Sequence, residues 1–395
     1  MIVLMKKIAT ALIILLLGAA GVWLFWPSTS KAPVTVKKPA VQKNLEAEKP
    51  ADTNLTLLAA GDFIAHDSIN MAAKQPDGSY NYLPLMDSFA PIFKKNDIRF
   101  CSDGVLNGGT KFGISGYPKF NSPTEFVDGM TKVGCNLVAN GTNHSFDRDQ
   151  SVINATADAW ARQPDMLAAV GLNHSQAERQ KVHVFTVKNT KVAFLAYTTY
   201  LNQDAPAQND YGVNVYSEDF AKTQIAEAKK QGAQIIIVSM RWGTEFSGQV
   251  NEQQKKDAQF LAGQGVQLVL GHGPHVTQPV QKIGNTFVWY SLGNFLGTQL
   301  QAETLFNGLA QITFDAKTHR VSQQSFLPIY SHYEWTADQA AKEDLLARTN
   351  VKMHLLKDVT QDMINKQQLK TTAATQKDRL QSTLNALGQT IPFSN

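Results

Sequence analysis

The sequence is short of cysteine, of net charge and of the loops that bind nucleotides. Its 395 residues include two cysteines, 18% charged residues and a formal net charge of +4. Two cysteines exclude a disulfide framework; Cys101 and Cys135 either form one bridge or remain two small buried thiols. A small net charge without a basic stripe excludes the usual footprint of a nucleic-acid-binding protein, so we expect no nucleic-acid partner. No Gly-rich phosphate loop and no nucleophile elbow occur, which disfavours nucleotide kinases and serine hydrolases.

The chain does have the composition of a globular protein, with 43% hydrophobic residues, preceded by an apolar N-terminal run. Residues 8–26 carry no charge and are just long enough to span a bilayer. Lys6 and Lys7 precede this run, so the positive-inside rule places the N-terminus in the cytoplasm and the bulk of the chain outside. Aromatic residues at its outer end favour an uncleaved anchor over a cleaved signal peptide, the competing interpretation. We therefore expect a single-pass cell-membrane protein whose bulk is extracellular.

Four regions follow from the pattern: a cytoplasmic stub and transmembrane anchor over 1–26, a linker over 27–52, a main domain over 53–300 and a C-terminal extension over 301–395. The linker is rich in Pro, Lys, Ala, Val and Glu without an apolar period. The extension begins with strand-like residues and continues over 337–390 as a polar, helix-prone stretch with little core-forming material, packed on or projecting from the main domain.

Short apolar runs alternate with amphipathic stretches in the main domain, which predicts an α/β fold. The predicted strands are 55–60, 97–101, 136–139, 182–187, 191–197, 234–240, 266–270 and 286–291. The predicted helices are 83–94, 123–133, 151–162, 217–231 and 251–264, with Ser151, Ser217 and Asn251 as N-caps. The strands 182–187 and 191–197 read as a β-hairpin, so the sheet is mixed.

Three segments far apart in the sequence place metal-binding side chains at the ends of predicted strands. The residues are Asp62, then Asn143 and His144, then His272 and His275. Side chains that leave successive strands at one sheet edge are how an α/β protein builds a site. Imidazole, amide and carboxylate together suit Mn, Fe or Zn better than Ca. We predict one or two divalent ions held by Asp62, Asn143, His272 and His275, with His144 as the catalytic proton donor; the competing interpretations are a turn or cap Asp and a structural histidine.

Five further residues are candidates for this site or for binding its ligand. They are His66, Asp103, Arg241, Glu245 and Asn294. His66 either binds the metal or hydrogen-bonds within the site, and Asn294 follows a strand from which it can hydrogen-bond rather than hold metal.

The ordered motifs resemble the CapA family, the capsule proteins of poly-γ-glutamate synthesis, within the calcineurin-like metallophosphoesterase superfamily. The resemblance covers residues 55–298. It rests on Gly61-Asp62 with His66-Asp67, Gly116-Tyr117-Pro118 with Phe120-Asn121-Ser122-Pro123, Thr142-Asn143-His144 with Phe146-Asp147, Trp242-Gly243-Thr244-Glu245, Gly271-His272 with Pro274-His275-Val276 and Gln278-Pro279-Val280, and Tyr290-Ser291-Leu292-Gly293-Asn294-Phe295. It implies a four-layer α/β/β/α metallophosphoesterase-like domain with a two-metal site. It also implies a role in the synthesis or export of an anionic surface polymer, with that polymer or its synthase and export subunits as partners.

Two departures from the family pattern affect the metal site. Ser102-Asp103-Gly104 stands where the family usually has Asn-Leu-Glu or Asn-Gln-Glu, so the carboxylate expected at position 104 is missing. Asp103 is the candidate to replace it, although adjacent residues on a strand face opposite ways. Arg241 stands where the family has histidine, and a guanidinium has no lone pair for a metal. Either a one-metal site remains, or Arg241 replaces a cation and the pocket binds a phosphate or carboxylate.

Three hypotheses about function follow. The first is a membrane-anchored, outward-facing CapA-like protein whose partly degenerate site binds an anionic ligand. The second is an active metal-dependent phosphoesterase at the cell surface, in which a metal-bound water attacks and His144 assists the leaving group. The third is a wall-associated module that recruits partners through its C-terminal region.

Overall fold

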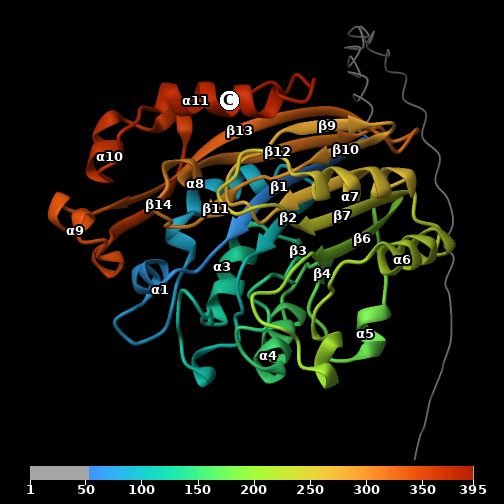
Figure 1. Cartoon of the computed structure of the whole chain (residues 1–395), viewed down its shortest axis with the longest axis horizontal. Helices are drawn as coiled ribbons and strands as arrows, with labels where there is room; N and C mark the ends of the chain where they lie inside the picture. The colour runs from blue at the N-terminus through green and yellow to red at the C-terminus, as the bar shows by residue number, and fades with distance from the viewer. Residues whose placement is uncertain (1–52, 395) are drawn as a thin grey trace, which may run out of the picture. The chain divides into compact units, whose positions relative to one another are not determined.

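Two β-sheets organise the part of the chain that the computed structural model describes, residues 53–394. The predicted anchor and linker over residues 1–52 lie outside the described residues. Between residues 53 and 394, none of the helices has the length and hydropathy needed to span a bilayer. Strands and helices alternate through most of this region, so the predicted mixed α/β class is confirmed (Figure 1).

The larger sheet has eight strands in the order β14-β13-β12-β1-β2-β3-β4, with β11 also paired to β1. Their bounds are β1 Leu55–Phe63, β2 Ile98–Asp103, β3 Leu137–Ala139, β4 Ala168–Val170, β11 Asn294–Leu296, β12 Phe306–Phe314, β13 Val321–Glu334 and β14 Thr349–Leu355. Strands β1 to β4 are parallel neighbours, whereas β12, β13 and β14 are antiparallel. The parallel half therefore brings the carboxyl ends of β1, β2 and β3 to one edge.

The smaller sheet has six strands in the order β5-β6-β7-β8-β10-β9. Their bounds are β5 His183–Val187, β6 Thr190–Thr198, β7 Ile235–Arg241, β8 Leu268–His272, β9 Val280–Ile283 and β10 Thr286–Trp289. The predicted hairpin is confirmed as the antiparallel pair β5 and β6. Lys188 and Asn189 between them have φ values of 46° and 65°, the left-handed conformation that a two-residue hairpin turn of matching twist requires.

Most of the helices lie between strands along the chain, and α10 and α11 follow the last strand. The α-helices are α1 Asp67–Ala73, α2 Ala90–Phe93, α3 Glu125–Val133, α4 Gln150–Ala161, α5 Gln176–Gln180, α6 Glu218–Lys230, α7 Glu252–Gly263, α8 Ala302–Leu305, α9 Ala337–Ala341, α10 Gln361–Lys366 and α11 Ala373–Asn385. The 3-10 turns are η1 Leu83–Leu85, η2 Asp87–Phe89, η3 Thr110–Phe112, η4 Ala207–Gly212, η5 Leu345–Ala347 and η6 Leu356–Asp358.

Two helix predictions need correction. A continuous helix over 83–94 was wrong, because two prolines divide that stretch into the short elements η1, η2 and α2. Ser151 is not the N-cap of α4; the carboxylate of Asp149 accepts the backbone N–H of Ser151 instead. The predicted N-caps Ser217 and Asn251 are confirmed at α6 and α7.

The two sheets face each other, because alternate residues of β6 belong to two different buried clusters. The first set is Val192, Phe194 and Ala196, in the cluster shared with the larger sheet. The second set is Ala193, Leu195 and Tyr197, in the cluster shared with α6 and α7. Phe100 of β2 and Phe194 of β6 meet across the interface with ring centroids 5.9 Å apart. Helices α6 and α7 therefore cover the outer face of the smaller sheet, as Figure 1 shows.

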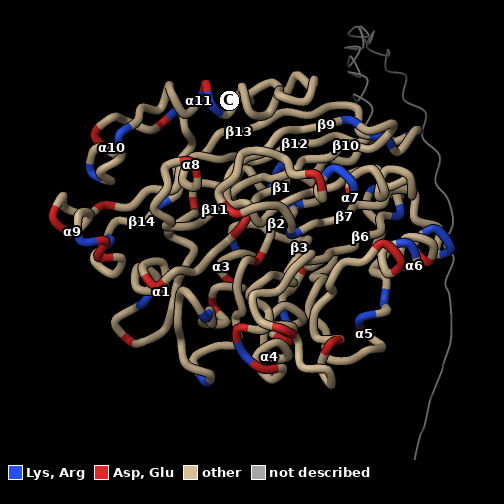
Figure 2. Tube along the Cα trace, viewed as in Figure 1, with Lys and Arg blue, Asp and Glu red and all other residues tan. Residues whose placement is uncertain are grey.

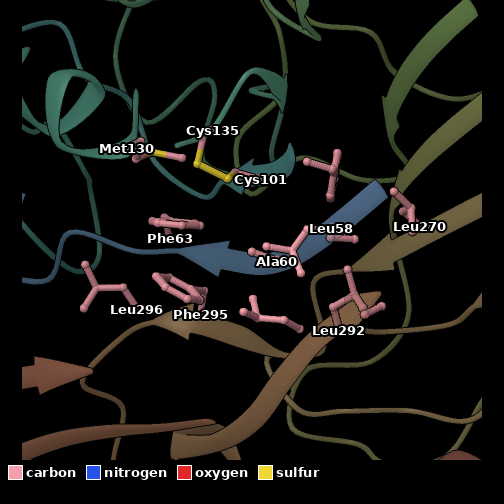
Figure 3. Packing of buried hydrophobic residues seen from close by; sticks show 14 of the residues in the cluster. Leu58, Ala60, Phe63, Cys101, Met130, Cys135, Leu270, Leu292, Phe295 and Leu296 are labelled. Carbon is pink, nitrogen blue, oxygen red and sulfur yellow. A yellow bond between two sulfur atoms is a disulfide. The ribbon is translucent and has the colours of Figure 1, made fainter. Parts of the chain in front are cut away.

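The two cysteines form a disulfide, which decides between the two alternatives left open by the sequence. Cys101 of β2 is bonded to Cys135, which directly precedes β3. Figure 3 shows the bridge packed beside Met130 of α3 and above Phe63 at the end of β1. It therefore lies on the outer face of the larger sheet, away from the smaller one.

The C-terminal residues are part of the larger sheet. Strands β12 to β14 extend that sheet beyond β1. The stretch 337–390 was expected to be helical with little core material, but it contains β14, and Leu380 and Leu384 of α11 are buried in the main core. In Figure 1, α11 lies over β13. Figure 2 shows basic and acidic residues mixed along the outer elements, with the central strands mostly uncharged.

Candidate functional site

The candidate site lies between the two sheets, at the carboxyl ends of four strands. Asp62 of β1 and Ser102 of β2 come from the larger sheet, and Arg241 of β7 and His272 of β8 from the smaller one. Each of these side chains lies on the face of its strand that points into the space between the sheets. On β7, for example, Ile235 and Ile237 lie on the same face as Arg241 and belong to the core cluster that both sheets share. Strand alternation therefore aims polar groups from both sheets at one point.

Two glycines permit the close backbone approach that this arrangement needs. Gly61 precedes Asp62, and a Cβ added there would lie 1.9 Å from the carbonyl oxygen of Gly293. Gly271 precedes His272, and a Cβ there would lie 2.0 Å from the carbonyl oxygen of Tyr290. Any side chain at either glycine would push the strand ends apart and displace the following site residue.

The carboxylate of Asp62 is the centre of the site and is fully buried. Its Oδ1 accepts the hydroxyl of Ser102 at 2.7 Å and lies 3.2 Å from Nδ1 of His272. Its Oδ2 lies 3.1 Å from Nδ1 of His275. Burial opposes the charged form, but the guanidinium of Arg241 and the hydrogen bonds of both histidines together hold the pKa of Asp62 well below its usual range. Asp62 is therefore an ionised acceptor at neutral pH.

Arg241 is 1% exposed and is paired within the site. Its Nη1 lies 3.3 Å from each carboxylate oxygen of Asp62, and its Nε donates to Oδ1 of Asn143. Asn143 in turn donates through Nδ2 to Asn202 at 3.0 Å. The guanidinium therefore binds the two oxygen groups that the sequence offered as metal ligands.

His272 is held in one tautomer by its neighbours. Ser102 has a single hydroxyl proton and donates it to Asp62, so the contact of 2.9 Å between Ser102 Oγ and His272 Nδ1 requires Nδ1–H as donor. Its Nε2 then accepts from Ser239 at 2.8 Å. Burial lowers the pKa of His272, with Asp62 acting in the opposite direction. Both ring nitrogens are thus used within the protein.

His144 meets this cluster through Asn202 and has an orienting carboxylate. Its Nδ1 lies 2.7 Å from Oδ2 of Asp147, which also accepts the backbone N–H of Phe120 at 2.8 Å. The ring of Phe120 meets the imidazole edge-on, with centroids 4.7 Å apart. This fixes Nδ1–H toward Asp147, and Nε2 lies 3.4 Å from Nδ2 of Asn202.

The two remaining predicted histidines, His275 and His66, have different contacts. His275 has φ +63°, and its Nδ1 also lies 3.0 Å from Oδ1 of Asn294, while its Nε2 is 3.9 Å from the carboxylate of Glu245. His66 accepts the backbone N–H of Thr298 at 3.3 Å. Burial, followed by the charges of His275, Arg348 and His144, lowers the pKa of His66 to about 3, so this ring is neutral.

The prediction of Asp103 as a site residue needs correction, because strand alternation turns its side chain away from the site. Its Oδ2 accepts from Nε1 of Trp160 at 2.8 Å and from Nδ2 of Asn107 at 2.6 Å, on the outer face of the larger sheet. Burial raises the pKa of Asp103 to about 7, against the effect of these two hydrogen bonds. Asp103 therefore does not replace the carboxylate missing at Gly104.

The residues present do not fit a two-metal centre. Among residues 53–394, no group of three or more His, Cys, Asp or Glu side chains is arranged to hold a metal ion. The physical reason is Arg241, whose fixed charge lies against Asp62 and would repel a dication there. Asn143 and His272 are already engaged, as described above. The predicted ligands thus bind one another and Arg241.

Three residues of the site were not singled out from the sequence. Ser239 lies two residues before Arg241 on the same strand face, so period-two alternation could have found it. Asn202 comes from the loop after β6 and gave no motif. Arg348 lies in the C-terminal region and, with His66, His144, Arg241 and His275, borders a cavity of about 420 Å³.

Comparison with known proteins gives one family and several relatives. Residues 56–299 match the family model described as bacterial capsule synthesis protein PGA_cap. The chain is 26% identical over 239 residues to the PGA biosynthesis protein CapA of Bacillus subtilis (strain 168), which is 60% of each chain. It is 26% identical over 191 residues to the capsule biosynthesis protein CapA of Bacillus anthracis, which is 47% of this chain and 46% of that protein.

The match thus spans 60% or less of the length of these curated relatives. Among solved structures, the chain is similar to the calcineurin-like phosphoesterase YfkN from Bacillus subtilis. That likeness has a TM-score of 0.43 and 14% identity, and it covers 83% of this chain and 98% of the other.

Proposed function

The chain belongs to the PGA_cap family of bacterial capsule synthesis proteins, and from this premise we propose that it serves the synthesis or export of an anionic surface polymer of the poly-γ-glutamate type. In this proposal the metallophosphoesterase-like domain binds an anionic group of the polymer and does not cleave a phosphoester at a two-metal centre. The observation that carries the proposal is the buried pair of Arg241 and Asp62, with Nη1 3.3 Å from the carboxylate. Arg241 stands at the position where the family pattern has a metal-binding histidine.

The proposal places the folded part of the chain outside the cytoplasm, held to the membrane by the apolar run at residues 8–26. The disulfide between Cys101 and Cys135 supports this location, because disulfides form and persist in oxidising compartments. Partners in this setting are the polymer itself and the subunits that synthesise or export it.

A metal-dependent phosphoesterase is the second candidate, and one observation favours it. His144 borders the cavity and is oriented by Asp147 at 2.7 Å, an arrangement typical of a general acid or base. This candidate predicts metal-dependent turnover of phosphoesters that is lost in Asp62→Ala and His272→Ala. Turnover that neither substitution changes would exclude it.

The proposed function is tested by deleting the gene in its own bacterium and measuring the surface anionic polymer after extraction and hydrolysis to monomers. We expect the polymer to be lost and to return with the wild-type gene. Arg241→Met should fail to restore it, whereas Arg320→Met, in the exposed turn between β12 and β13, should restore it fully. Immunoblots establish that both variants accumulate. A deletion strain with unchanged polymer would contradict the proposal.

A further inference from the structure

The cavity at the site is completed by residues beyond the family match. Its volume of about 420 Å³ is that of a small-molecule or chain-segment site. The match to the family model ends at residue 299, yet Leu345 and Arg348 form part of the cavity wall. The C-terminal region therefore supplies cavity groups that the family pattern does not include.

Arg348 is a buried cation without an anionic partner. It is 5% exposed, and its Nη1 donates to the carbonyl oxygen of Thr298. Its guanidinium lies over the rings of Tyr333 and Trp335, at 4.5 and 4.9 Å from their centroids. Its Nε and Nη2 are buried and have no hydrogen-bond partner, and among residues 53–394 no carboxylate lies within ion-pair distance of it. Donors buried without an acceptor are costly, so an acceptor is missing here.

The contrast with Arg241 identifies which cation is available to a ligand. Arg241 borders the same cavity, but its charge is balanced by Asp62 and its Nε is used by Asn143. The carboxylate among the residues that line the cavity is Glu245, whose side chain is 46% exposed and lies 3.9 Å from Nε2 of His275. Arg348 is therefore the cavity cation that has no ion-pair partner among the described residues, although the charge of Glu343 acts on it at longer range.

An apolar rim surrounds this charge. Six large hydrophobic side chains are exposed among the described residues, and four of them border this cavity. These four are Tyr117, Phe246, Leu300 and Leu345, with exposures of 77%, 43%, 38% and 44%. A cluster of exposed apolar residues is typical of a binding surface. A ligand that fits both features carries an anionic group on an apolar stem.

We propose that Arg348 binds a carboxylate of a γ-linked glutamyl chain, whose methylene groups lie on the rim of Tyr117, Phe246, Leu300 and Leu345. This inference rests on the proposed function and names the group that holds the polymer. Each unit of such a chain has one free carboxylate beside a short methylene stem, which matches a fork of donors within an apolar rim. Because Nε and Nη2 are buried, this binding requires the Arg348 side chain to rotate and turn them toward the cavity, a kind of change that is common on binding.

The test is the affinity of the purified full chain for a fluorescently labelled short γ-glutamyl oligomer, measured by anisotropy at fixed salt. Arg348→Gln should weaken binding by about tenfold or more, the loss of a charge-assisted hydrogen bond. Arg348→Lys should retain part of the affinity because it keeps the charge. Arg379→Gln is the matched control: Arg379 also lies in the C-terminal region and donates to a backbone carbonyl, that of Phe306, but does not border the cavity.

The outcomes separate this inference from the function on which it rests. If Arg348→Gln binds the oligomer with an affinity within twofold of the wild type, the role of Arg348 is overturned and the proposed function is not. An equal loss in Arg379→Gln would also overturn it, since any lost charge would then suffice. Displacement of the oligomer by inorganic phosphate at lower concentration than by free glutamate would overturn the choice of a carboxylate. Wild-type chain that binds no oligomer would overturn both proposals.

Discussion

Replacing Arg241 by methionine is the perturbation that bears most directly on the buried site. Methionine keeps much of the length of the arginine stem and removes the guanidinium. Asp62 then loses the cation whose Nη1 lies 3.3 Å from both its oxygens, and Asn143 loses the donor to its Oδ1. The substitution therefore leaves an ionised carboxylate that is 0% exposed without a countercharge.

The expected cost is about 3 kcal/mol of unfolding free energy at pH 7, the lower end of the range for breaking a buried ion pair from one side. The lower end applies because Asp62 keeps its contacts with Ser102, His272 and His275. Removing both charges, in Asp62→Asn with Arg241→Met, should cost less than the sum of the two single changes by about 2 kcal/mol, since neither partner is left unpaired.

The loss should also depend on pH. The pKa of Asp62 in the folded protein is lowered, so the ionised form adds stability that is fully present above the unfolded value of about 3.9. That stability is lost as the pH falls through the lower folded value. Arg241→Met removes the countercharge behind it, so the difference between wild type and variant should be largest above about pH 4 and should shrink on further acidification.

Urea unfolding at pH 7 and at several lower pH values measures both effects, with near-ultraviolet and far-ultraviolet circular dichroism as parallel probes. Arg320→Met, in an exposed turn, is the control and should change nothing. A loss below about 1 kcal/mol at pH 7, the range of an exposed ion pair, would refute the reasoning. A loss that grows on acidification would refute it equally.

Two further predictions concern the outer face of the larger sheet. Cys101→Ala with Cys135→Ala should lower the unfolding free energy by about 3–4 kcal/mol, because the bridge closes a loop of 34 residues in the unfolded chain; an unchanged urea midpoint would contradict this. Asp103→Asn should change the pH profile of stability. The folded pKa of Asp103, about 7, lies above its unfolded value, so the native state binds the extra proton between about pH 4 and 7 and wild-type stability falls as the pH rises. The asparagine variant should gain relative to wild type across that window, and a parallel profile would count against a buried, protonated Asp103.

The sequence predicted the long elements of the fold well and the short ones poorly. Apolar runs with turn residues at their ends located strands such as β7 and β8, and polar caps located α6 and α7. The three-residue strands β4 and β11 exist only through pairing with neighbours, so no local period marks them. Strand β14 lies in a polar stretch and is a strand because it pairs with β13, which is tertiary information.

The sequence identified several residues of the candidate site but not the hydrogen bonds and ion pairs that join them. Strand ends and family motifs identified Asp62, Asn143, His272 and His275, and the structure brings them within one cluster with Arg241. Which donor pairs with which acceptor depends on the separation of the two sheets, on which the sequence is silent. Arg348 could not be identified from the sequence, because its proposed role depends on a cavity wall that distant segments form together.

Metal content is the most direct test of the central claim, that Arg241 pairs with Asp62 and leaves no two-metal centre at the site. The full chain is purified from cells grown with excess Mn, Fe and Zn and analysed for bound elements, beside the double variant Gly104→Glu with Arg241→His. The account predicts almost no metal in the wild-type chain and clear uptake in the double variant, which restores the missing carboxylate and imidazole. Stoichiometric metal in the wild-type chain, or no gain in a folded double variant, would contradict it.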